Sequence, residues 1–200
     1  MGASSPPIDS AWRQLPNAIS VARLVCVPLL AWLAWQGHAS LFGPLFVAAL
    51  VSDIVDGWIA RRFGFASPRG ARLDSLADTA LFLVSLYALW AFHPRVVIEY
   101  PLATASVAGL WILENVASLW RYGRLSSFHT YLSKAAAYAL GIFLGWLFLF
   151  GFVQPLMASA VCLAVLASLE ELALLALLPQ WRTNVRGLWW VWRSSRSASR

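Results

Sequence analysis

The chain has 200 residues, of which 60% are hydrophobic and only 12% are charged, and its formal net charge is +6. Soluble domains carry about 25% charged residues, so this composition, with a mean hydropathy of +0.67, excludes a soluble globular enzyme and a disordered chain. The basic residues lie between long apolar stretches, which is typical of membrane topology and excludes a nucleic-acid-binding module. Cys26 and Cys162 both lie in apolar stretches and indicate neither a disulfide framework nor a cysteine-based metal site.

Six apolar stretches are long enough to cross a membrane, because a spanning helix needs about 20 mostly apolar residues. In chain order they are 18–36, 41–63, 70–92, 101–121, 133–152 and 155–178. The sequence therefore predicts an all-α polytopic membrane protein with six transmembrane helices. Its expected parts are a juxtamembrane surface segment (1–15), a six-helix domain (16–178) and a basic, Trp-rich cytoplasmic tail (179–200) that forms a surface helix on anionic lipid.

The distribution of lysine and arginine predicts the orientation, since cytoplasmic loops are enriched in both. With the amino terminus inside, every basic residue except Arg95 falls on the cytoplasmic side of the membrane. Both termini are therefore predicted to be cytoplasmic. The expected location is an integral position in a membrane such as the bacterial inner or plasma membrane, in contact with its lipids.

Acidic residues inside the predicted spans are the most informative feature of the sequence. A carboxylate at the bilayer centre costs about 2.5–3.5 kcal/mol, so such residues must face a polar interior or bind cations. On two successive spans, the spacing of the aspartates is i,i+3 and i,i+4, which places each pair on one helix face. The short connection near 64–69 makes these spans antiparallel neighbours and predicts that the four carboxylates converge. The intramembrane acidic residues are Asp53, Asp56, Asp74, Asp78, Glu114, Glu170 and Glu171.

Four converging carboxylates offer only oxygen ligands, which suit Mg²⁺ or Mn²⁺, and the absence of nearby His or Cys argues against zinc. Gly57 and Ala60 share the aspartate face and leave space for a ligand to approach the backbone. Arg61 lies one turn beyond Gly57, in position to hold a phosphate. Gly70 opens the next predicted helix one turn before Asp74.

These residues form the pattern Asp53-x2-Asp56-Gly57-x2-Ala60-Arg61-x8-Gly70-x3-Asp74-x3-Asp78. The pattern resembles the full signature of the CDP-alcohol phosphotransferase family, with a match at every fixed position, and the six-helix layout resembles the family over essentially the whole chain. The resemblance implies a homodimeric enzyme that transfers a phosphatidyl group from CDP-diacylglycerol, or a phosphoalcohol from another CDP-alcohol, to an alcohol and releases CMP. It also implies that the four aspartates hold two divalent metal ions, Mg²⁺ or Mn²⁺, and that Asp78 takes the proton from the attacking hydroxyl.

The same resemblance implies a nucleotide pocket around the signature. Gly57 would allow close packing of the cytidine nucleotide, Arg61 would contact its phosphates, and Ser67 would bring a hydroxyl to it. The segment 16–20, together with Arg23, resembles the family's entry to the first helix and would close the pocket from the other side; the alternative is a helix start with a flanking cation. The expected donor-binding residues are Pro16, Asn17, Ala18, Ile19, Gly57, Ala60, Arg61, Ser67 and Gly70.

The acceptor is less strongly indicated than the donor. Lys134, Arg124 and Arg121 are candidates for binding the phosphate of a small acceptor such as glycerol 3-phosphate, and phosphatidylglycerophosphate synthases also carry a lysine at the position of Lys134. The alternative is that these cations contact lipid headgroups. The Leu-Asp-Ser-Leu-Ala-Asp string at 73–78 instead resembles bacterial phosphatidylserine synthases. A different class, an ion transporter that uses the intramembrane carboxylates, would need acidic groups spread through the membrane depth.

Overall fold

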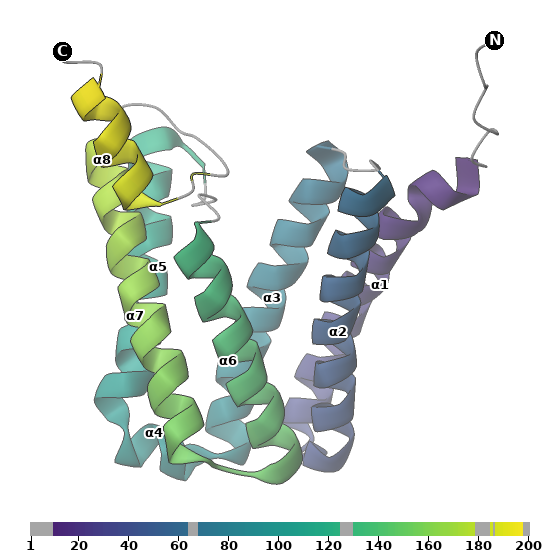
Figure 1. The fold of residues 1–200 in the computed structure, drawn as a ribbon. Coiled ribbons are helices and arrows are strands. Elements are labelled where there is room, and N and C mark those ends of the chain that lie inside the picture. Colours follow the sequence, from purple (N-terminus) through teal and green to yellow (C-terminus); the bar gives the residue numbers. More distant parts are fainter. Residues whose placement is uncertain (1–9, 64–67, 125–129, 179–184, 186, 198–200) are drawn as a thin grey trace. The chain divides into compact units, whose positions relative to one another are not determined.

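The structure, a computed structural model, describes residues 10–63, 68–124, 130–178, 185 and 187–197. Within these ranges only the backbone is described for residues 10–18, 20, 60, 61, 68–72, 192 and 194–197. Helices are the only regular elements in these ranges, so the all-α prediction is confirmed for them (Figure 1). The helices are α1 (Ser10–Trp35), α2 (Ala39–Phe63), α3 (Pro68–Phe92), α4 (Pro94–Glu99), α5 (Pro101–Tyr122), α6 (Tyr131–Phe150), α7 (Gln154–Leu177) and α8 (Leu188–Ser197).

Five of these helices, among the described residues, are long and apolar enough to cross a membrane. They contribute the segments Ala39–Ile59, Leu73–Phe92, Pro101–Tyr122, Tyr131–Phe150 and Gln154–Leu177. The apolar segment of α1 within the described residues is shorter, Val21–Trp35. The structure thus gives five candidate spans where the sequence predicted six, and these apolar helices indicate an integral membrane protein.

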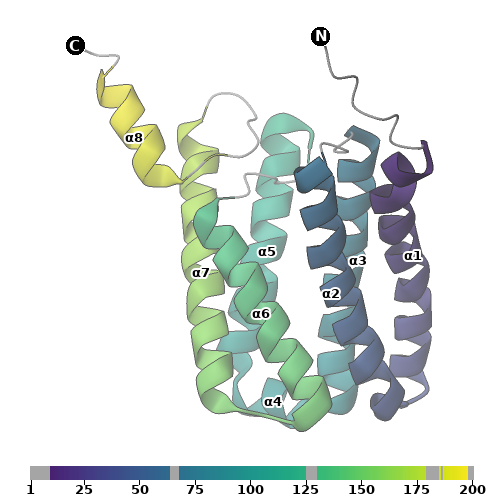
Figure 2. The ribbon, with the colours of Figure 1, turned by 45° about the vertical axis from the view of Figure 1, so that its right-hand side comes forward.

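The chain forms two compact units, Met1–Pro94 and Arg95–Arg200, and each is described by itself. In the first unit, α1 packs along both α2 and α3 (Figure 2). The ring of Phe42 near the start of α2 contacts Phe92 at the end of α3 edge-on, with 5.3 Å between ring centroids. This antiparallel arrangement places the last turns of α2 opposite the first turns of α3, which is where the signature aspartates lie.

The outer faces of the first unit are apolar. Val25, Trp35 and Trp58 are all more than half exposed, whereas Leu30, on the packed face of α1, is completely buried. An exposed apolar surface of this kind is unfavourable in water and favourable against lipid tails, which agrees with the membrane assignment.

In the second unit, α5, α6 and the short α8 all pack against α7. The carboxyl end of α7 is held by α5, since the Tyr122 hydroxyl donates to the Leu178 carbonyl at 2.6 Å and Arg121 donates to the same carbonyl at 3.3 Å. Leu188 and Val191 of α8 pack against the buried end of α7, which leaves Trp189 exposed. The exposed Trp189 can meet another surface, and the surface helix on anionic lipid predicted for the tail stays a prediction.

The start of α8 is fixed by Glu170 of α7, whose Oε1 accepts a hydrogen bond from the Leu188 backbone N–H at 3.0 Å. A carboxylate at the first turn of a helix satisfies a free N–H group and interacts favourably with the helix dipole. Gly187 precedes this turn with a φ of +148°, and a Cβ atom there would lie 2.9 Å from the same Oε1. The positive φ favours glycine at this position, and a side chain there would also push the Glu170 carboxylate away from its contact.

We expect Gly187→Ala to destabilise the docking of α8 by about 1–3 kcal/mol, the usual range for a strained backbone position. Faster trypsin cleavage at the exposed Arg193, together with a lower Tm, would report the change. Gly109→Ala is the matched control, because a Cβ at Gly109 in α5 meets nothing within 4 Å and alanine favours a helix. Equal cleavage rates in the two variants would show that the Glu170 contact does not hold α8.

Candidate functional site

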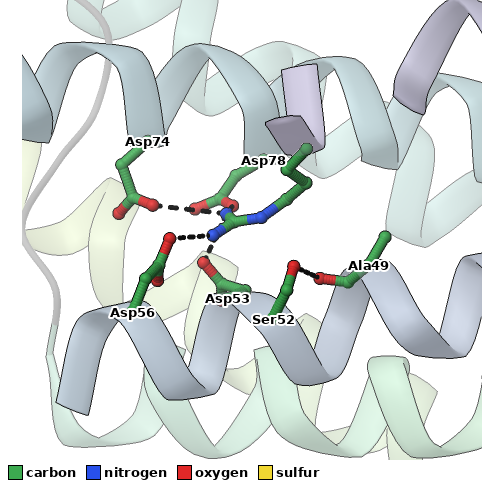
Figure 3. A network of polar contacts seen from close by, with 7 residues as sticks. Ala49, Ser52, Asp53, Asp56, Asp74 and Asp78 are labelled. Carbon is green, nitrogen blue, oxygen red and sulfur yellow. Dashed lines mark hydrogen bonds and ion pairs between the residues drawn. The ribbon is translucent and has the colours of Figure 1, made fainter. Parts of the chain in front are cut away.

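The four signature aspartates converge in the first unit. Asp53 and Asp56 lie on α2, Asp74 and Asp78 lie on α3, and the four carboxylates point toward one another (Figure 3). One oxygen each from Asp53, Asp56 and Asp74 lie within 4.8 Å of one another. Because i,i+3 and i,i+4 neighbours share a helix face, two antiparallel helices bring both pairs to one place.

Arg23 of α1 lies at the centre of this cluster, and its side chain is fully buried. Its Nη1 donates to the Oδ1 atoms of Asp53 at 2.5 Å, Asp78 at 3.1 Å and Asp74 at 3.2 Å. Its Nη2 donates to Oδ2 of Asp56 at 2.5 Å. A buried guanidinium is costly unless it is paired, so the four ion pairs explain how α1 can carry this charge in an otherwise apolar segment.

The position of Arg23 also adds a third helix to the expected packing. The sequence predicted α2 and α3 as antiparallel neighbours with converging aspartates, which the structure bears out, and α1 packs against both of them. The long arginine side chain reaches from α1 to the carboxylates of both helices. Sequence reasoning placed Arg23 beside a nucleotide and missed this role, although a lone cation in an apolar stretch already signals a buried partner of opposite charge.

The cluster has a closed end and an open end. The Asp56 side chain is only 4% exposed, whereas the Asp78 side chain is 52% exposed. Asp53 and Asp74 are intermediate between these two. A polar ligand can therefore approach the carboxylates from the side of Asp78, while Asp56 and Arg23 form the floor.

The ligand atoms that the cluster offers fit a divalent cation. All four side chains offer carboxylate oxygens, and Arg23 neutralises only part of their combined negative charge. Closely spaced hard oxygen ligands with excess negative charge are what Mg²⁺ and Mn²⁺ prefer. Asp53, Asp56 and Asp74 are close enough to share one ion.

The residues expected to bind the nucleotide are described only in part. Gly57 follows Asp56 directly and is half-buried, and Ile19 lies one turn before Arg23 on α1 and is also half-buried. Ser67 lies outside the described residues. The remaining candidates fall within helices but their side chains are outside the described part, namely Pro16, Asn17 and Ala18 in α1, Ala60 and Arg61 in α2, and Gly70 in α3.

The three acceptor-phosphate candidates belong to the second unit. Arg121 donates to the Leu178 carbonyl and lies over the Tyr122 ring at 5.7 Å, which favours a structural role. Arg124 is exposed just beyond α5, and its carbonyl accepts a hydrogen bond from the Ser118 hydroxyl at 2.8 Å. Lys134 is exposed in the first turn of α6, so its ammonium group is accessible to an anionic ligand.

Comparison with known proteins identifies the class to which this fold and site belong. The family model described as CDP-alcohol phosphatidyltransferase matches residues 13–169, a range that includes Arg23 and all four aspartates. The chain belongs to this family, and the predicted family membership is confirmed.

Individual relatives carry two kinds of name. A CDP-diacylglycerol--glycerol-3-phosphate 3-phosphatidyltransferase from Pseudomonas fluorescens is 33% identical over 53% of this chain and 55% of its own length. A cardiolipin synthase (CMP-forming) from Streptomyces coelicolor is 36% identical over 63% of this chain and 60% of its own length. A Schizosaccharomyces pombe cardiolipin synthase (CMP-forming) / mitochondrial hydrolase fusion protein is 31% identical over 64% of this chain but only 22% of its own length. The matches thus span less than two thirds of these relatives.

Proposed function

We propose that the protein transfers a phosphatidyl group from CDP-diacylglycerol to a small phosphorylated alcohol such as glycerol 3-phosphate and releases CMP. The observation that carries this proposal is the convergence of four carboxylates, all from the family signature, at an accessible position on α2 and α3. The grouping of these carboxylates in one cluster favours a transferase over an ion transporter, which would need acidic groups along a path through the membrane.

The four aspartates would hold two divalent ions, Mg²⁺ or Mn²⁺. When bound, such ions neutralise negative charge on the phosphoryl groups of the donor. In the reaction, the acceptor hydroxyl oxygen forms a bond to the phosphorus of the phosphatidyl group, and the bond from that phosphorus to the oxygen of the leaving CMP breaks. Asp78 is the most exposed of the four carboxylates and would accept the hydroxyl proton.

The other signature residues would position the donor. Gly57 has no side chain and would let the cytidine nucleotide approach α2 closely, while Arg61 would pair with its phosphates. Ser67 and the segment 16–19 would complete the pocket. The match to the family signature supports these roles.

We also propose six spans, with both termini and the aspartate cluster on the cytoplasmic side. The positions of the basic residues support this orientation. It leaves the diacyl tails of the donor in lipid and exposes the nucleotide and the soluble acceptor to the cytoplasm. A homodimer with one active site per chain is part of the proposal.

Lys134 is the residue we propose for the acceptor phosphate. A charge-assisted contact to phosphate contributes about 1.5–3 kcal/mol, so Lys134→Gln is expected to raise the KM for glycerol 3-phosphate about 10–100-fold. The KM for CDP-diacylglycerol should stay unchanged. Arg193→Gln, which removes an exposed charge from α8, is the control. An unchanged KM for glycerol 3-phosphate in the Lys134 variant would remove this residue from the acceptor site.

A second acceptor is favoured by the relatives named cardiolipin synthase (CMP-forming). Transfer of a phosphatidyl group to phosphatidylglycerol yields cardiolipin and CMP, so the donor chemistry would be the same. If phosphatidylglycerol is the acceptor, no phosphorylated soluble acceptor takes part in the reaction, so Lys134→Gln would not act through a contact with its phosphate.

Product analysis distinguishes these functions. Purified protein would be incubated with CDP-diacylglycerol, Mg²⁺ or Mn²⁺, and in turn glycerol 3-phosphate, inositol phosphate, serine or phosphatidylglycerol, with CMP and the lipid product measured by mass spectrometry. The proposal predicts phosphatidylglycerophosphate with glycerol 3-phosphate. Cardiolipin formed only with phosphatidylglycerol would establish the second function, and phosphatidylserine formed only with serine would contradict both.

A further inference from the structure

We infer that Arg23 is an internal counter-cation that competes with divalent metal ions for the aspartate oxygens and thereby sets the metal affinity of the site. The inference rests on the proposed function only in that the cluster binds such ions. It assigns Arg23 a role as a positioning residue for the carboxylates, separate from any contact with the nucleotide.

Arg23 contacts the same carboxylates that an ion would need. Its guanidinium touches all four carboxylates, including Asp53, Asp56 and Asp74, whose oxygens are close enough to share one cation. A metal ion that binds to these carboxylates competes with the guanidinium for their negative charge and, where it uses the same oxygen, for the same lone pairs. Binding of a divalent ion is therefore expected to weaken some of these four ion pairs.

The hydrogen bonds of Arg23 are poorly matched to the donors that it carries. Nη1 has two N–H groups but faces oxygens of three aspartates, Asp53, Asp74 and Asp78. The buried Nε has no hydrogen-bond partner among the described residues. Strong arginine–carboxylate pairs use two parallel N–H groups on one carboxylate, and none of the four contacts has this form. The guanidinium is thus held by the summed charge of the cluster more than by a specific geometry.

The distances indicate which contacts are given up first. The two α2 carboxylates are bound at 2.5 Å, whereas Asp74 and Asp78 of α3 are bound at 3.2 and 3.1 Å and are about half exposed. The α3 carboxylates therefore give up their contacts with Arg23 first when a metal ion binds to the cluster. Asp53 and Asp56 keep the guanidinium beside the site, where its charge continues to oppose cation binding.

Removal of the guanidinium tests this competition with readouts that need no substrate. The full chain in detergent would be titrated with Mn²⁺, with free Mn²⁺ followed by electron paramagnetic resonance, and its Tm would be measured in EDTA and in Mn²⁺. Arg23→Gln is expected to bind Mn²⁺ at least about 10-fold more tightly than the wild type, because a positive charge next to the ion has been removed. Its Tm in EDTA should be lower than that of the wild type, because the carboxylates then repel one another unopposed.

Two further variants serve as controls. One tests whether the loss of any nearby positive charge has the same effect, and the other covers the case in which Arg23→Gln does not fold. Arg62→Gln removes an exposed charge from the end of α2 that carries the aspartates, and it should change the Mn²⁺ affinity less than about 2-fold. Arg23→Lys keeps a charge but its ammonium cannot reach all four carboxylates, so it should bind Mn²⁺ about 2–5-fold more tightly than the wild type. If Arg23→Gln does not fold, the lysine variant still decides the question.

Equal or weaker Mn²⁺ affinity in the folded Arg23 variants would overturn the inference, as would the absence of Mn²⁺ binding in both the wild type and the variants. These outcomes differ from failure of the proposed function. Tighter Mn²⁺ binding in Arg23→Gln, in a protein that releases no CMP with any acceptor, would leave the competition intact and refute the transferase activity.

Discussion

Substitution of Asp78 by asparagine is expected to lower the rate of CMP release at least about 100-fold, the lower range for loss of a general base. Asparagine has the same shape as aspartate but cannot accept the proton of the attacking hydroxyl. The Asp78 side chain is the most exposed of the four and lies on the open side of the cluster, where a hydroxyl can reach it. The rate is measured on purified protein with saturating CDP-diacylglycerol and acceptor.

The same substitution should not unfold the protein. Removal of one carboxylate from a cluster with excess negative charge relieves repulsion, so the Tm of Asp78→Asn should equal or exceed that of the wild type. Glu99→Gln is the matched control, because it removes an exposed carboxylate at the end of α4 that is no part of the family signature. Near-normal CMP release by a folded Asp78→Asn sample would exclude Asp78 as the base.

Removal of divalent ions by EDTA is expected to reduce CMP release to the background level, and Mg²⁺ or Mn²⁺ should restore it. Arg23 neutralises only part of the charge of the four carboxylates. The negative charge of the donor phosphates must therefore be neutralised at the cluster by divalent ions. Far-UV circular dichroism in EDTA should remain unchanged, because Arg23 still bridges α1 to α2 and α3. Full activity in protein shown by elemental analysis to be free of metal would refute the metal-dependent mechanism.

The positions of the long helices could be predicted from the sequence alone because hydrophobic length is a strong signal. The stretches 41–63, 70–92 and 101–121 correspond to Ala39–Phe63, Pro68–Phe92 and Pro101–Tyr122 in the structure. Two of these helices begin at proline, which fits the first turn of a helix and marks its start. The first helix extends beyond its prediction and begins at Ser10, since its polar amino-terminal turns carry no membrane signal.

Features that depend on contacts between helices could not be predicted in this way. The spacing of the aspartates showed which of them share a helix face, but not that Arg23 of α1 reaches into their cluster. Periodicity describes one helix at a time and does not specify the rotation of a neighbour. The six-residue α4 was missed because it is too short to show a period. The link from Glu170 to Leu188 depends on how α8 folds back onto α7, which no local pattern records.

The central claim is that the aspartate cluster of α2 and α3 carries a CMP-forming phosphatidyl transfer. The most direct test compares CMP release from CDP-diacylglycerol by the purified wild type and by Asp74→Asn, with glycerol 3-phosphate or phosphatidylglycerol as acceptor and Mg²⁺ or Mn²⁺ present. Asp74 is suitable because its side chain is 43% exposed, so the substitution should not disturb packing. We predict one CMP per lipid product from the wild type and only background release from a variant with an unchanged Tm. Equal CMP release by the two proteins, or none from a folded wild type with either acceptor, would contradict the account.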